Sequence, residues 1–80
     1  MSNIDNIQFI ANINGYEIVR IADSDDPMSG SIEVVEGCHA HRSWRFVDNS
    51  LPKQFRGDHP TELTAIGYAR NVASQMPKVQ

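Results

Sequence analysis

The chain has 80 residues, of which 40% are hydrophobic and 21% are charged, and its formal net charge is −3 with neutral histidines. This length predicts a single domain, 1–80, with a thin core, because a domain of this size buries little more than about 60% of its unfolded surface. The composition excludes a broadly basic nucleic-acid protein and a highly charged disordered chain. The single cysteine, Cys38, excludes an internal disulfide framework.

The first residues, MSNIDNIQFIANING, lack the basic stretch and continuous apolar run of a signal peptide. No part of the chain has the roughly 20 mostly apolar residues of a membrane-spanning helix. Together with the lone cysteine, these features predict a cytoplasmic protein with no membrane partner. We expect residues 1–5 to be disordered and residues 77–80 to form a short tail.

The N-terminal third of the chain is predicted to form a β-hairpin. Residues 7–13 and 16–22 both show the period-two alternation and the β-branched or aromatic side chains of strands. Asn14 and Gly15 stand between them, and both tolerate the positive φ that a type I′ turn requires.

The segment 23–30, DSDDPMSG, contains three carboxylates, a proline and a glycine without apolar periodicity, which predicts a loop. Carboxylates at this density raise the question of calcium. An EF-hand loop that starts at Asp23 needs glycine at its sixth position and glutamate at its twelfth, but Met28 and Val34 stand there. We therefore interpret the segment as a solvated acidic loop.

Two further strands are predicted at residues 31–36 and 40–47, separated by a break at Gly37. In the second of them Trp44 and Phe46 share one face, and we expect this aromatic pair to lie in the core. Residues 48–59 contain a proline, a glycine and several charges, which predicts an irregular segment that Leu51 or Phe55 fixes to the body of the protein.

The pattern then becomes helical over residues 61–76, with apolar side chains at steps of three and four. Thr61 or Asp58 can cap the helix, and Pro60 suits its first turn. Gly67, inside the helix, is interpreted as allowing a close approach to the sheet, and the alternative is that the helix simply tolerates it.

The predicted fold class is α+β: a three- to four-stranded antiparallel sheet built of hairpins, with one C-terminal α-helix packed on one face. The other face is then open to solvent or to a partner. The predicted core consists of Phe9, Ile18, Ile32, Val34, Trp44, Phe46, Leu63, Ile66, Ala69, Val72 and Ala73.

Charge is distributed unevenly along the chain. Residues 1–37 hold seven carboxylates and one arginine, a net charge of −6, whereas residues 38–57 hold four basic residues and one aspartate, a net charge of +3. The four basic residues are candidates for a partner-binding surface that attracts an acidic partner, unless neighbouring strands neutralise them. They are Arg42, Arg45, Lys53 and Arg56.

These observations favour a non-enzymatic module that binds a protein partner through the uncovered sheet face or a strand edge. Self-association into a homodimer through paired strand edges is the simplest form of this hypothesis. The alternative is a small nucleic-acid-binding domain, because Trp44, Phe46 and Phe55 alternate with basic residues in the segment 42–56. The acidic overall balance opposes that alternative.

The densest group of reactive side chains is Cys38, His39 and His41, which offers a second alternative, a metal or thiol site. His59 is the remaining candidate for a fourth metal ligand. In a strand, His39 and His41 point to the same side and Cys38 to the other, which opposes both uses. We expect no catalytic residue, no metal and no cofactor, and the chain contains no P-loop, dinucleotide-binding or zinc-protease motif.

The chain resembles a group of small uncharacterised proteobacterial proteins that structural-genomics work favoured. The resemblance covers about residues 15–75 and rests on the Gly15-Tyr16-x-Ile18 strand, the acidic loop, the Ile-x-Val and Trp-x-Phe strands, and a threonine-led, alanine-containing helix. It implies a bacterial protein with a compact sheet-plus-helix fold and carries over no catalytic residue. The chain departs from the group at Thr64, where an acidic residue is usual.

Overall fold

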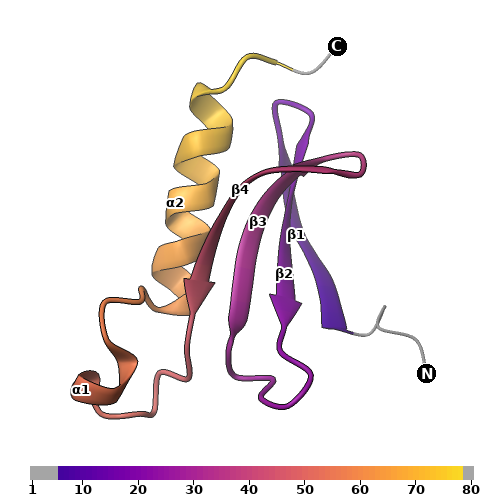
Figure 1. Cartoon of the computed structure of the whole chain (residues 1–80). Helices are drawn as coiled ribbons and strands as arrows, with labels where there is room; N and C mark the ends of the chain where they lie inside the picture. The colour runs from indigo at the N-terminus through magenta and orange to yellow at the C-terminus, as the bar shows by residue number, and fades with distance from the viewer. Residues whose placement is uncertain (1–5, 79–80) are drawn as a thin grey trace.

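The computed structural model describes residues 6–78 and contains a four-stranded antiparallel sheet followed by two helices (Figure 1). Its elements are β1 (Ile7–Ile13), β2 (Tyr16–Ala22), β3 (Gly30–Glu36), β4 (His39–Phe46), α1 (Lys53–Arg56) and α2 (Glu62–Gln75). The sheet order is β1-β2-β3-β4, so each strand pairs with its neighbour in sequence. The predicted α+β class with a C-terminal helix is confirmed. The expectations for residues 1–5 and for the end of the tail lie outside the described residues.

The first hairpin has the predicted turn. Asn14 and Gly15 adopt φ values of 58° and 88°, so both lie in the left-handed region that a type I′ turn uses. A β-bulge interrupts the pairing of β1 with β2 between Phe9 and Ala11. The bulge changes the face to which the residues before it point, because side chains in a strand alternate with a strict period of two.

The acidic loop between β2 and β3 is closed by its own hydrogen bonds. The carboxylate of Asp26 accepts from the amide of Met28 at 3.1 Å and from the hydroxyl of Ser29 at 2.8 Å. The Ser29 hydroxyl, which is buried, accepts in turn from the amide of Asp48 at 2.9 Å. The acidic loop therefore fixes the position of Asp48, at the start of the segment 48–59.

Helix α2 begins after Thr61, whose hydroxyl accepts a hydrogen bond from the amide of Thr64 at 3.2 Å. The helix packs on the sheet through a stripe of three fully buried alanines, Ala65, Ala69 and Ala73, spaced by four residues. These small side chains bring the helix backbone close to the sheet. The interpretation that Gly67 allows a close approach to the sheet was wrong: Gly67 is exposed, and a methyl group placed on it would meet nothing within 4 Å.

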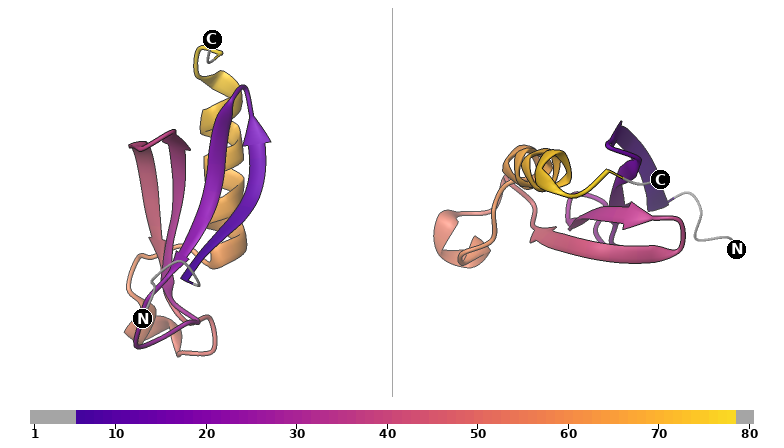
Figure 2. Two further views of the ribbon diagram at one scale, coloured as in Figure 1. Left: turned by 90° about the vertical axis from the view of Figure 1, so that its right-hand side faces the viewer. Right: turned by 90° about the horizontal axis from the view of Figure 1, so that it is seen from above.

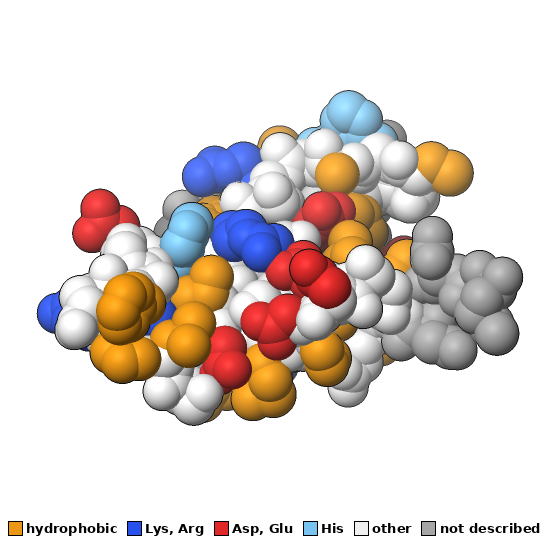
Figure 3. Space-filling model, turned by 60° about the horizontal axis from the view of Figure 1, so that its bottom comes forward, with side chains coloured by type: hydrophobic (Ala, Val, Ile, Leu, Met, Phe, Trp, Pro, Cys, Tyr) orange, Lys and Arg blue, Asp and Glu red, His pale blue; other side chains and the backbone are white. Residues whose placement is uncertain are grey.

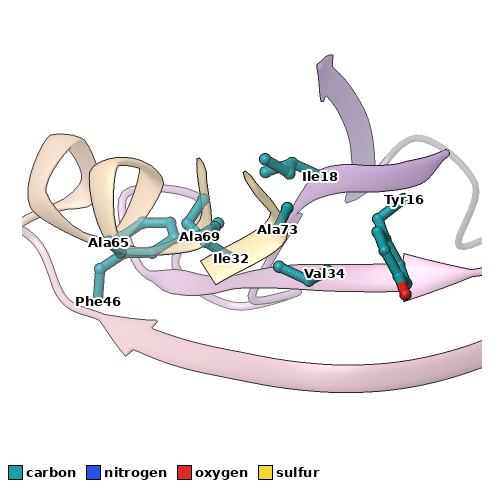
Figure 4. Packing of buried hydrophobic residues seen from close by; sticks show 8 residues of the cluster. All are labelled: Tyr16, Ile18, Ile32, Val34, Phe46, Ala65, Ala69 and Ala73. Carbon is teal, nitrogen blue, oxygen red and sulfur yellow. The ribbon is translucent and has the colours of Figure 1, made fainter. Parts of the chain in front are cut away.

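The core lies between α2 and the facing side of the sheet (Figure 4). Ile18, Ile32, Val34 and Phe46 are fully buried, as predicted, whereas Trp44 is partly buried at the edge of this cluster. Within residues 6–78, the buried apolar residues are Tyr16, Ile18, Ile32, Val34, Phe46, Ala65, Ala69 and Ala73.

Two residues of the predicted core are exposed. Phe9 is 57% exposed because the bulge places it opposite Val19, on the face that α2 does not cover. Leu63 is 80% exposed because it precedes Ala65 by two positions, which is about 200° around a helix and therefore the opposite side.

The segment 48–59 contains the single helical turn α1. The prediction that Leu51 or Phe55 fixes this segment to the body was wrong, because both side chains are exposed. Polar contacts hold it instead. Arg56 donates to the side-chain oxygen of Asn49 at 3.0 Å.

The sheet curves around α2, which lies mainly over β3 and β4, and the β1–β2 turn reaches the C-terminal end of the helix (Figure 2). The side-chain amide of Asn14 donates to the carbonyl oxygens of Ala73 and Ser74, at 3.1 and 3.2 Å. The hydroxyl of Tyr16 donates to the carbonyl oxygen of Pro77. The face away from the helix is therefore the outer, convex face of the sheet.

Candidate functional site

An apolar patch occupies one corner of the convex face. It consists of Ile7 and Phe9 on β1 and Val19 and Ile21 on β2, and we call it the outer patch. The strand pairing places Ile7 opposite Ile21 and Phe9 opposite Val19. Ile7 is 52% exposed and Phe9 57% exposed, while Val19 and Ile21 are partly buried. Large apolar side chains gathered on one uncovered sheet corner are typical of a protein-binding surface.

The remainder of the convex face is mostly polar, with Val35 and Ala40 as its apolar side chains, and this confines the outer patch to the β1–β2 corner. Alternation along the other strands brings carboxylates, hydroxyls and a guanidinium to this face. These are the side chains of Glu17, Ser31, Glu33, Ser43 and Arg45.

The two edges of the sheet differ in chemistry. β1, with the sequence IQFIANI, contains no charge, no proline and no glycine. β4, with the sequence HAHRSWRF, contains two arginines and two histidines, and its pairing is irregular beside Val34. Both edge strands contain an irregular pair, but only β4 also carries charges, which protect a strand edge from other chains, so β1 is the less protected edge.

The predicted basic surface is divided between two sides of the sheet. Arg42 is paired with Val34 and shares its face with Trp44, over whose ring its guanidinium lies at 5.4 Å. Arg45 is paired with Ser31 on the convex face. Their side chains therefore do not form one surface.

Arg45 is also engaged by the acidic loop. Its guanidinium donates two hydrogen bonds to the carboxylate of Asp23, at 3.0 and 2.6 Å. These bonds hold the pKa of Asp23 below its usual value and raise the pKa of Arg45. A similar pairing joins Arg20 to Glu62 at 3.1 Å. Neutralisation between neighbouring elements thus accounts for part of the uneven charge.

The other two predicted basic residues, Lys53 and Arg56, belong to α1. Arg56 is partly buried and bonded to Asn49. The structure therefore spreads the four residues over both sides of the sheet and a separate helical turn, and their role in partner binding stays a prediction.

The two histidines of β4 lie together, as predicted from their spacing. The rings of His39 and His41 are 4.6 Å apart in an edge contact, and His41 lies 3.0 Å from a carboxylate oxygen of Glu36. Cys38 is exposed in the turn before β4. His59 belongs to the segment between α1 and α2, and α1 lies at the opposite end of the molecule from the β3–β4 turn (Figure 1). Within residues 6–78, no three potential ligands are close enough to hold a metal ion.

Further exposed apolar side chains lie on the loops and helices. They are Met28, Leu51, Phe55, Leu63 and Tyr68. Figure 3 shows hydrophobic side chains gathered at the α1 end of the molecule, beside a group of acidic ones. These residues belong to separate elements and lie outside the outer patch.

Ile7 and Phe9 are the functional candidates that the sequence interpretation missed, because it assigned Phe9 to the core. A signal for them exists in the sequence: residues 7–13 form the only predicted strand without a charged side chain. The described chain, residues 6–78, encloses no pocket. Neither of its helices has the length and hydrophobicity that crossing a bilayer requires.

The chain matches none of the family models, curated proteins or solved structures with which it was compared.

Proposed function

We propose that the protein is a non-enzymatic cytoplasmic interaction module that binds a protein partner through the β1–β2 corner of its sheet. The observation that carries this proposal is the exposure of Ile7 and Phe9, more than half in each case, on a face that α2 leaves uncovered. Complete burial of such a side chain stabilises a complex by about 1.5–3 kcal/mol. Because Ile7 and Phe9 are each about half exposed, a partner that buries them can still gain about half of this free energy at each position.

The chemistry of the β1 edge supports the same location. An uncharged strand at the end of a sheet can add a further strand through its free backbone groups, while the neighbouring side chains supply specificity. Two residues of the outer patch, Ile7 and Phe9, belong to β1 and therefore also lie along its open backbone edge. One partner segment can therefore use both.

The test compares Phe9→Glu with Leu63→Glu, two substitutions that add a carboxylate at an exposed apolar position. Each variant and the wild type is immobilised and exposed to lysate, and a captured protein is purified and tested again with the same three baits. We expect direct binding that Phe9→Glu abolishes and Leu63→Glu preserves. Equal binding by both variants would remove the outer patch from the proposal. Circular dichroism confirms that both variants fold.

The nucleic-acid alternative receives less support from the geometry. Arg42 and Arg45 lie on opposite faces, and Asp23 occupies the guanidinium of Arg45. Trp44 is partly buried beside Tyr68, with ring centroids 6.4 Å apart. Few of the cations and aromatic faces that would bind a phosphate backbone and its bases are thus available together.

A further inference from the structure

We propose that the partner at the β1 edge is a second copy of this chain, paired antiparallel to β1 about a two-fold axis at Gln8. The inference rests on the interaction function proposed above and identifies the partner that binds at the β1 edge. β1 is the terminal strand of the sheet. Within residues 6–78, only β2 pairs with it. Its outer N–H and C=O groups are therefore available to an extended strand.

Charge favours a second copy at this edge. An antiparallel copy of IQFIANI brings no like charges together, because the strand contains none. The other edge, β4, contains two arginines, so a second copy paired there would bring cationic side chains from both strands into one interface. Of the two edges, only β1 is thus complementary to itself.

The bulge selects the register. Residues 7–9 form the regular part of β1 before the irregularity between Phe9 and Ala11. Pairing about Gln8 places Ile7 of one copy opposite Phe9 of the other, on the convex face of both. Contacts between aromatic and β-branched side chains in such cross-strand pairs are favourable. A shift by one residue would pair side chains that point to opposite faces, so it is disfavoured.

The shape of the molecule favours edge pairing over the stacking of two sheets. The convex face bends away from a partner that meets it face to face, and its exposed large apolar side chains, Ile7 and Phe9, lie at one corner. The molecule is also flat, with extents of 42 × 32 × 15 Å. Pairing at β1 joins the two outer patches side by side and extends the sheet to eight strands.

The expected dimer is weak. A stable interface buries about 800 Å² on each partner, whereas the proposed register sets only residues 7–9 of each seven-residue β1 against each other. We therefore expect a dimer that dissociates on dilution within the micromolar to millimolar range.

The test compares Gln8→Glu with Gln54→Glu by sedimentation and light scattering over that range. The two substitutions make the same chemical change, and Gln54 is exposed in α1, away from the edge. At position 8 the two carboxylates meet across the axis and repel, whereas within one protomer the new carboxylate lies opposite Arg20. We expect the dissociation constant of the Gln8→Glu dimer to rise about tenfold, which corresponds to about 1.4 kcal/mol. Gln54→Glu should leave it unchanged.

Cross-linking tests the register independently. In a Cys38→Ser background, Gln8→Cys places two thiols opposite each other at the axis, where mild oxidation should join them. Asn12→Cys lies in the same strand beyond the bulge and should give little product at the same concentration. Preferential cross-linking at position 12 would contradict the proposed register.

A monomer at millimolar concentration overturns the proposal, as does a dimer that Gln8→Glu and Gln54→Glu weaken equally. If the protein is monomeric but a purified partner binds it only when Phe9 is present, the proposal of a second copy is wrong and the interaction function stands. If neither a dimer nor a Phe9-dependent partner is found, both proposals fail.

Discussion

The side-chain amide of Asn14 caps the C-terminal end of α2 by donating to the carbonyl oxygen of Ala73 at 3.1 Å, across 59 residues of sequence. The last carbonyls of a helix have no partners within the helix, so they need donors from elsewhere. Here the donor is the left-handed residue of a hairpin turn, with φ 58°. One asparagine thus serves the turn and the helix together.

Replacing Asn14 separates these two roles. Asn14→Gly retains the left-handed conformation but loses the amide, so we expect the free energy of unfolding to fall by about 1 kcal/mol. Asn14→Asp should lose more, because a carboxylate cannot donate and is repelled by the negative end of the helix dipole. Urea unfolding measures both. A glycine variant as stable as the wild type would contradict the capping role.

The exposed glycine of α2 predicts a stabilising substitution. A methyl group on Gly67 meets nothing within 4 Å, and alanine is favoured over glycine in a helix by about 1 kcal/mol. We expect Gly67→Ala to raise the urea midpoint without changing the slope of the transition. A decrease in stability would show that the position contacts the sheet after all.

The buried alanines of α2 predict that a larger side chain destabilises the protein, in contrast to the substitution at Gly67. Ala69 is fully buried against the sheet, so Ala69→Leu must displace the helix, at a cost of about 1–3 kcal/mol. Arg70→Leu is the matched control, because Arg70 is exposed and arginine and leucine have similar helix propensities. Thermal unfolding should show a lower midpoint for the first variant and little change for the second.

The ion pair between Asp23 and Arg45 predicts a pH dependence. Because the pKa of Asp23 is lowered in the folded protein, its contribution to stability is complete above the ordinary carboxyl value of about 3.9. The contribution is lost as the pH falls through the lowered value. In Arg45→Gln, an NMR titration should return the pKa of Asp23 toward its ordinary value. Asp48, whose pKa is lowered by the backbone amide and hydroxyl of Ser50, should titrate unchanged in that variant.

Much of the fold could be predicted from local signals. The Asn14-Gly15 turn, the alternating strands and the Thr61 cap each depend on neighbouring residues, and all three are present as predicted. The errors have longer-range causes. The exposure of Phe9 follows from a bulge whose presence depends on pairing with β2, and periodicity within a single strand cannot reveal it.

The candidate site was less accessible to prediction than the fold. The segment 42–56 could be recognised as basic, but whether Arg42 and Arg45 act together depends on the face each one takes and on Asp23. The outer patch was not recognised in the sequence because isoleucine and phenylalanine, at positions 7 and 9, are also typical core residues. The bulge after Phe9, together with the position of β1 at the end of the sheet, places them outside the core.

The attachment of the hairpin turn to the helix end has a consequence for synthesis on the ribosome. Asn14 and Tyr16 emerge early, yet their acceptors lie at residues 73–77, which are made after all four strands. Until then the side of the sheet that carries Ile18, Ile32 and Phe46 has no cover, and such transient apolar surface promotes aggregation. The nascent chain therefore passes through a vulnerable interval that ends only after residues 73–77 have been made.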